Sequence, residues 1–183
     1  QYAALYSETL TVELENEFLP FLYPNQYVNF TPDSKASQLA LSLIDEDTVD
    51  VDALQQIYDY VVSNLTYDYE KADTVTTGYL PDVDETLKTG TGICFDYAAL
   101  TTAMLRSCDI PCKLQIGYTG DIKHAWIDVY IRSKGWVTNA VSFNGDSWSL
   151  MDPTFDSSAD SDDSEAIQDY IGNADNYTVQ FTR

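Results

Sequence analysis

The chain has 183 residues, a length that suits one domain with a core of ordinary size. Hydrophobic residues make up 44% and charged residues 21%, a balance typical of globular rather than disordered proteins. The net charge of −21 gives a surface that repels phosphate backbones, so nucleic acid is excluded as an expected partner. Because no apolar run reaches the ~20 residues that span a bilayer, we do not expect an integral membrane protein.

We expect a single domain over residues 1–183 with three parts. Residues 1–33 are irregular and interrupted by prolines, which suggests an N-terminal wrap around the core. The core occupies residues 34–155. Residues 156–183 form an acidic loop and a tail, for which the sequence predicts a short helix near 165–171 and a last strand at 177–181.

Helical patterns come first in the core. Residues 34–44 have helical composition, and apolar side chains recur at helical spacing over 54–65, where Asp50 or Asp52 could cap the start. One further helical turn is expected near 84–88. The stretch 93–108 (ICFDYAALTTAMLRSC) is apolar almost all round, which is typical of a helix in the interior of a domain.

After Pro111, which ends that helix, the hydrophobic period changes to two. Alternating runs at 113–118 and 124–131 predict two strands, and the runs at 136–143 and 147–151 predict two more. Helices followed by an antiparallel meander indicate an α+β fold.

Cys94 lies two residues after Gly92, at the start of the predicted buried helix. The free N–H groups and the positive dipole end of a helix stabilise a thiolate, which is the nucleophilic form of cysteine. Gly92 allows another backbone or a substrate to approach closely. The alternative interpretation makes Cys94 a small buried apolar residue.

His124 is the only histidine, so any chemistry that needs an imidazole depends on it. It opens a predicted strand, where it could accept the thiol proton and later protonate a leaving amine. The carboxylate of Asp152, at the end of the β-like run in SWSLMDPTF, could orient the imidazole. Taken singly, His124 could equally be a surface histidine in a turn and Asp152 a turn residue before proline. Together with Cys94 they match the order nucleophile, base, orienting group.

Three blocks of sequence carry a resemblance to a known family. They are GTGICFDYAALTTAMLRSCDIPCKLQIGY, then HAWIDVYI, then GWV and WSLMDPTF, preceded upstream by IYDYVVSNLTYDYEKA and YLPDVDETLKTGTGIC. The chain resembles the transglutaminase-like superfamily, a papain-like group that includes animal transglutaminases and many bacterial thiol hydrolases. The resemblance covers roughly residues 36–155. It implies a papain-like α+β core, a bacterial type of member, and a triad of Cys94, His124 and Asp152 that needs no metal or cofactor.

Two departures from the family pattern leave the triad intact. Members usually have Asn and then an acidic residue after HAW, where this chain has Ile127 and Asp128. They commonly have Gly before the IP turn, where this chain has Asp109. Asp tolerates left-handed backbone geometry better than most residues, so we expect the helix to end there in the same way.

Further site residues follow from the resemblance. The backbone N–H of Cys94 is one expected donor to the oxyanion, and relatives use an upstream side chain as the second, for which Tyr79 is our choice. Tyr79 could equally be a loop tyrosine packed on the core. Trp126 and Trp148 could wall the cleft, with core packing as the alternative for both.

Cys108 and Cys112 flank the helix-ending turn and leave two alternatives open. They could form a disulfide, which would suit an exported protein and leave Cys94 free. They could instead be reduced and buried as small apolar residues.

The expected function is cysteine-dependent acyl transfer on peptide or amide carbonyls, with a hydrolase (protease or amidase) favoured over a transglutaminase. The alternative is a non-catalytic binding or scaffold domain on the same fold. The negative charge would steer cationic or lysine-bearing peptide and protein substrates to the site. The acidic, lysine-poor composition and the Gln1 start favour an extracellular or cell-surface location, with the cytoplasm as the alternative.

Overall fold

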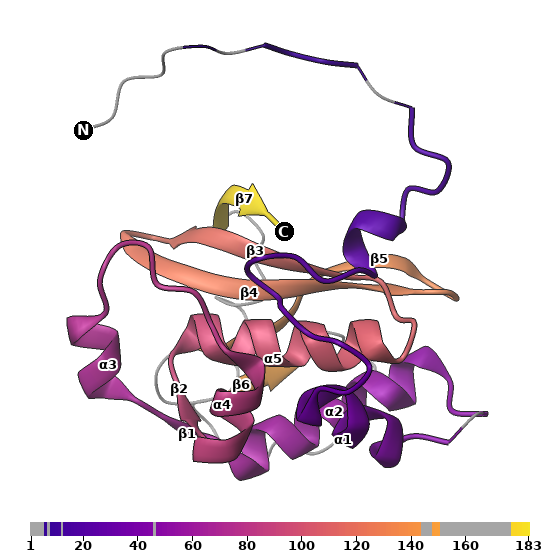
Figure 1. Ribbon diagram of the computed structural model, residues 1–183, viewed down its shortest axis with the longest axis horizontal. Helices are drawn as coiled ribbons and strands as arrows, with labels where there is room; N and C mark the ends of the chain where they lie inside the picture. The colour runs from indigo at the N-terminus through magenta and orange to yellow at the C-terminus, as the bar shows by residue number, and fades with distance from the viewer. Residues whose placement is uncertain (1–5, 7, 12, 46, 144–147, 151–176) are drawn as a thin grey trace, which may run out of the picture.

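A computed structural model describes residues 6, 8–11, 13–45, 47–143, 148–150 and 177–183. Helices form one layer and a curled antiparallel sheet forms the other, with the long helix α5 between the sheet and the remaining helices (Figure 1). This is the α+β fold that the order of patterns predicts. The short helix expected at 165–171 lies outside the described residues.

Five α-helices and one 3-10 turn lie in the described residues. Their bounds are Leu19–Phe21 (η1), Lys35–Leu43 (α1), Asp50–Asn64 (α2), Tyr69–Thr74 (α3), Val83–Thr89 (α4) and Cys94–Ser107 (α5). Four of the α-helices confirm the expected patterns, whereas the sequence predicted no helix over α3. The Asp68 side chain begins α3 by accepting the N–H of Lys71 at 2.9 Å.

The prediction that Asp50 or Asp52 caps α2 is wrong. Val49 is the N-cap residue and makes no side-chain cap. The Asp50 carboxylate instead accepts hydrogen bonds from Arg132, whose Nη2 lies 2.6 Å from Oδ1. The carboxylate therefore ties the start of α2 to the turn after strand β4.

Helix α5 is the centre of the core, as its apolar sequence predicts. Every residue from Asp96 to Arg106 is buried. Helices α1, α2 and α4 pack on it from one side, and strands β3 and β4 pack on it from the other. The helix ends in the expected left-handed turn, because Asp109 has a φ of 57°.

Five strands form the main sheet in the order β6-β5-β4-β3-β7. Their bounds are Cys112–Thr119 (β3), Ile122–Ile131 (β4), Gly135–Phe143 (β5), Trp148–Leu150 (β6) and Tyr177–Thr182 (β7). The first four confirm the antiparallel meander, and β7 pairs antiparallel with β3 at the other edge. A separate parallel pair, β1 (Thr66–Tyr67) with β2 (Thr91–Gly92), leads into α5.

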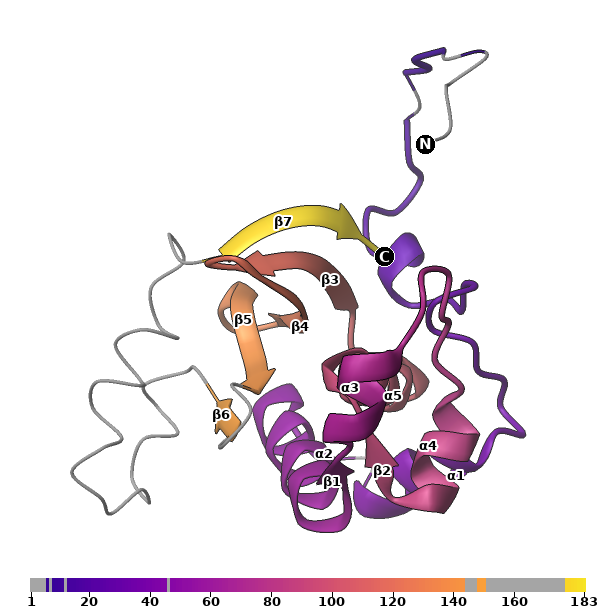
Figure 2. The same cartoon turned by 90° about the vertical axis from the view of Figure 1, so that its left-hand side faces the viewer.

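Strands β4 and β5 diverge at one end. Their register runs from Ile131↔Gly135 to Ile127↔Val141, whereas β4 and β3 stay paired through His124 and Ala125. The strand β5 curves away from β4 toward β6 and the helices (Figure 2). The His124 end of β4 therefore has one side that β5 does not cover within the described residues.

The N-terminal segment packs on the sheet near η1, and further along it Val28 and Phe30 are buried in the core. The Phe18 and Tyr130 ring centroids lie 4.5 Å apart, and those of Phe21 and Trp136 lie 5.4 Å apart. The η1 turn lies on the side of the sheet away from the other helices (Figure 1). Upstream, Leu10 is 72% exposed and the chain runs away from the body. None of the helices described is both long enough and apolar enough to cross a membrane.

Candidate active site

Cys94 is the first residue of α5, as the sequence predicts. The β1–β2 pairing, in which Tyr67 lies opposite Gly92, brings a tyrosine beside this helix start. A Cβ atom at Gly92 would lie 2.7 Å from the Cβ of Asp96, so only glycine fits between β1 and the first turn of the helix. The local sequence Gly-Ile-Cys therefore fixes where the thiol emerges.

Three hydrogen-bond donors surround the Cys94 sulfur. They are the backbone N–H of Phe95 in α5, the backbone N–H of Ala125 in β4, and the hydroxyl of Tyr67 in β1. Each lowers the pKa of the thiol, but burial has the larger effect and raises this pKa overall. The thiol is thus protonated at neutral pH, and the three donors are positioned to stabilise the thiolate when it forms.

His124 lies on strand β4 and is only 7% exposed, so the interpretation as a surface histidine in a turn is wrong. Its ring stacks on Trp126 with centroids 6.1 Å apart and planes 15° apart. Burial lowers its pKa to about 4, which leaves the imidazole neutral at physiological pH. A neutral imidazole is the form that can accept a proton.

The structure brings Cys94 next to the segment that carries His124. The sulfur meets the N–H of Ala125, the residue that follows His124, at the end of β4 that β5 leaves uncovered. Asp152 lies outside the described residues, and so does the side chain of Trp148. Trp126 is 1% exposed, so it packs beneath the His124 ring rather than lining an open surface.

Tyr67, rather than Tyr79, places its hydroxyl at Cys94. The Tyr79 hydroxyl donates a hydrogen bond to the Asp96 carboxylate and accepts one from Lys71 Nζ at 2.7 Å. Sequence reasoning missed Tyr67, Lys71 and Asp96 as parts of the site. The one available signal was the pair of tyrosines in NLTYDYEKA, of which Tyr67 lies in β1 and Tyr69 begins α3. The pairing of β1 with residues 91–92 is non-local, so the sequence did not reveal it.

Cys108 and Cys112 are free thiols in the structure, as is Cys94. Cys112 is fully buried, and its sulfur lies 3.5 Å from the Thr102 hydroxyl. Of the two alternatives for Cys108 and Cys112, the structure contains the reduced pair rather than the disulfide. Within the described residues, no group of three or more His, Cys, Asp or Glu side chains could hold a metal ion.

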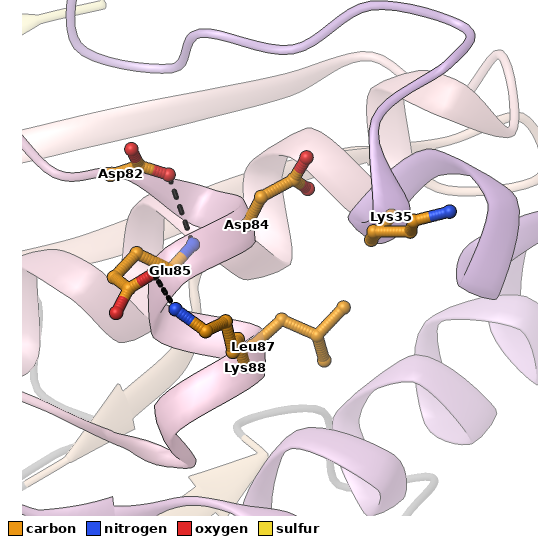
Figure 3. A pocket seen from close by; sticks show the side chains of 6 residues that line it. All are labelled: Lys35, Asp82, Asp84, Glu85, Leu87 and Lys88. Carbon is orange, nitrogen blue, oxygen red and sulfur yellow. Dashed lines mark hydrogen bonds and ion pairs between the residues drawn. The ribbon is translucent and has the colours of Figure 1, made fainter.

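A separate hollow lies between α1 and α4 (Figure 3). Its lining is mostly charged and consists of Lys35, Asp82, Asp84, Glu85, Leu87 and Lys88. The carboxylates have structural partners: Asp82 caps α4 through the N–H of Glu85, and Asp84 accepts the N–H of Ala36, both at 3.0 Å. The hydrogen bond from Ala36 to Asp84 links α1 to α4, and the hollow is not part of the thiol site.

A family model for the transglutaminase-like superfamily matches residues 37–153, more than half of the chain. The chain belongs to this superfamily. The match begins in α1 and includes Cys94, His124 and Asp152. The resemblance that the sequence blocks carry is therefore confirmed.

Individual relatives share the domain but are longer. YebA of Bacillus subtilis is 27% identical over 154 residues, which cover 72% of this chain and 21% of YebA. The UPF0252 protein MJ1282 of Methanocaldococcus jannaschii is 36% identical over 62 residues, or 31% of this chain and 18% of that protein. The chain thus spans about a fifth of the length of these relatives.

Among solved structures, a candidate cysteine protease from Cytophaga hutchinsonii superposes with a TM-score of 0.54 at 25% identity. The superposition covers 68% of this chain and 42% of that one. It confirms the fold class expected from the sequence.

Proposed function

We propose that this chain is a cysteine-dependent acyl-transfer enzyme that acts on peptide or amide carbonyls. The observation that carries the proposal is the hydrogen bond to the Cys94 sulfur from the N–H of Ala125, the residue that follows the chain's only histidine. Membership of the superfamily and the likeness to a candidate cysteine protease support it.

In the proposed reaction, the Cys94 proton passes to His124 and the sulfur attacks the carbonyl carbon, so a C–S bond forms and the carbonyl oxygen becomes an oxyanion. Collapse of this intermediate breaks the C–N bond, and His124 returns the proton to the leaving amine. Water, or another amine, then attacks the thioester and releases Cys94. Asp152 is the proposed carboxylate behind the imidazole.

Tyr67 is the side chain best placed to act on the charge that develops in this reaction. Its hydroxyl lies at Cys94, and burial raises its pKa to about 12, so it stays a donor at neutral pH. In the proposed mechanism it stabilises the thiolate and then the oxyanion, the role for which the sequence suggested Tyr79.

We favour hydrolysis over transamidation and a cationic or lysine-bearing substrate. The net charge of −21 supports the substrate class, because a negative surface attracts basic peptides. We also propose an extracellular or cell-surface location, for which the acidic, lysine-poor composition is the support.

The proposal is tested by profiling a peptide library with and without added primary amines. We expect wild type to release amines from peptide or amide bonds and Cys94→Ala to lose this activity by at least about 1000-fold. The matched control is Cys108→Ala, which removes a half-buried thiol at the other end of α5 and should retain activity. Equal turnover by Cys94→Ala and wild type would refute the proposed mechanism.

A further inference from the structure

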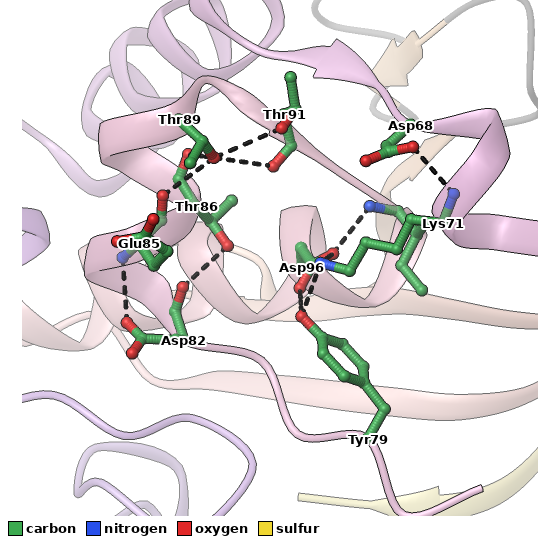
Figure 4. Close-up of polar contacts among 10 residues, drawn as sticks. Asp68, Lys71, Tyr79, Asp82, Glu85, Thr86, Thr89, Thr91 and Asp96 are labelled. Carbon is green, nitrogen blue, oxygen red and sulfur yellow. Dashed lines mark hydrogen bonds and ion pairs between the residues drawn. The ribbon is translucent and has the colours of Figure 1, made fainter. Parts of the chain in front are cut away.

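The carboxylate of Asp96 is a buried charge in the first turn of α5, two residues after Cys94. Its side chain has no exposure to solvent. It accepts hydrogen bonds from the backbone N–H of Ile93 at 2.8 Å, from Lys71 Nζ at 2.7 Å and from the Tyr79 hydroxyl. These three groups come from the residue before Cys94, from α3 and from the loop that leads to α4 (Figure 4).

Lys71 provides the positive charge that pairs with this carboxylate. A buried carboxylate is costly unless it is paired and hydrogen-bonded, and Lys71 forms its salt bridge while only 30% exposed itself. The Lys71 ammonium also lies 4.5 Å from the centre of the Tyr79 ring. The Asp68 cap on the N–H of Lys71 fixes the start of α3, so this lysine is held in position from both ends.

The charge of Asp96 acts on Cys94. A negative group beside a thiol disfavours the thiolate, and Asp96 raises the pKa of Cys94 in this way. The other groups that face the sulfur are the Tyr67 hydroxyl from β1, the N–H of Phe95 from α5 and the N–H of Ala125 from β4. Lys71 and Tyr79 act on the sulfur through Asp96, because both bond to its carboxylate.

We propose that Lys71 is a positioning residue of the thiol site: its ammonium holds the Asp96 carboxylate against the N-terminus of α5 and offsets part of the field of that carboxylate at Cys94. Without this ammonium, the first turn of α5 would present an uncompensated negative charge to the nucleophile. With it, Asp96 orders the Gly92–Cys94 segment and disfavours the thiolate less than an unpaired carboxylate would. This inference rests on the proposed function, in which Cys94 is the nucleophile.

The test compares the pH dependence of Cys94 alkylation by iodoacetamide in wild type and Lys71→Met, with the adduct mapped by mass spectrometry. In Lys71→Met we expect the apparent pKa of Cys94 to rise by about one unit and the rate at pH 7 to fall about tenfold. The matched control is Lys88→Met, because Lys88 lies 2.8 Å from Glu85 in an exposed pair on α4. It should leave the profile unchanged.

A second variant separates electrostatics from packing. The double variant Lys71→Met/Asp96→Asn removes both charges, so we expect the profile to return toward that of wild type. A Lys71→Met protein that melts at a lower temperature but keeps the wild-type profile would overturn the proposal, because the role would then be structural only. If Lys71→Met does not fold, Asp96→Asn is compared with the double variant, because these two proteins differ only at Lys71. A lower apparent pKa of Cys94 in Asp96→Asn supports the proposal, and equal values in the two proteins overturn it.

Turnover is measured on the same proteins and tests a different claim. If wild type turns over no peptide or amide, the proposed function fails, while the alkylation profiles still decide the role of Lys71. If wild type is active, we expect Lys71→Met to lower kcat at pH 7 more than it raises KM, and the loss to shrink as the pH rises.

Discussion

His124 should couple the stability of this protein to pH. Burial lowers the pKa of the imidazole from 6.5 to about 4. Between these two values the unfolded chain binds a proton that the folded chain excludes, so acidification favours unfolding. At about 1.4 kcal/mol for each pH unit, the difference amounts to about 3 kcal/mol, fully lost once the pH has fallen to about 4.

The assay uses the fact that the chain has one histidine. Its Cε1–H signal in a carbon-edited NMR spectrum needs no assignment and should titrate near pH 4 in the folded protein. Urea unfolding at pH 7 and pH 4.5 measures the coupling, with His124→Gln as the control because it retains a polar side chain but cannot titrate in this range. The many carboxylates contribute equally to both proteins, so wild type should lose most of the 3 kcal/mol in excess of the variant.

A titration of the imidazole at pH 6.5 or above would refute this reasoning. It would mean that the protonated ring has a charged partner that outweighs burial, and Asp152 is the candidate that the sequence offers. The resting site would then contain imidazolium rather than neutral imidazole, and His124→Gln would lose more stability than wild type on acidification.

Three further predictions test the surroundings of the site. Gly92→Ala should lower the free energy of unfolding by about 2 kcal/mol, because its Cβ would meet that of Asp96 at 2.7 Å; a thermal melt equal to wild type would contradict this. Arg106→Met should lower the free energy of unfolding, measured in urea, by about 3 kcal/mol, because the buried guanidinium donates hydrogen bonds to the carbonyls of Cys112, Tyr23 and Arg183. A loss below about 1 kcal/mol would show that water takes over these hydrogen bonds. Tyr67→Phe should lower kcat at least about tenfold with little change in KM and raise the apparent pKa of Cys94; unchanged kcat in a steady-state assay would remove Tyr67 from the mechanism.

Much of the fold was predictable because its strongest signals are local. The alternation over β3 and β4 and the all-round apolar α5 each reflect one element packing on the core, so period and composition sufficed. The position of β7 beside β3 was not predictable, because strand pairing depends on a partner distant in sequence. Asp50 illustrates the same limit: its place at the start of α2 favoured a cap, but an arginine 82 residues away provides a charged partner instead.

In the candidate site too, residues placed by local sequence were predictable, and residues placed by non-local contacts were not. Cys94 and His124 were identifiable because Cys94 begins α5 and His124 is the third residue of β4, and the local sequence predicts both elements. Tyr67 reaches the sulfur only through a parallel pair of two residues, which has no periodicity to detect. Lys71 contacts Asp96 from the six-residue helix α3, whose sequence has no helical pattern beyond the Asp68 cap.

These non-local contacts determine which chemistry is available to the pair. Burial raises the pKa of the thiol and lowers that of the imidazole, so both groups favour their neutral forms and a preformed ion pair is disfavoured. In the proposed reaction the proton must therefore move as the sulfur attacks, and the donors at the sulfur matter most at that moment. The N–H groups of Phe95 and Ala125 and the hydroxyl of Tyr67 gain strength as negative charge develops, whereas Asp96 opposes it and Lys71 offsets part of that effect. Reactivity at this site is thus set by residues that surround the Cys and His as much as by the pair itself.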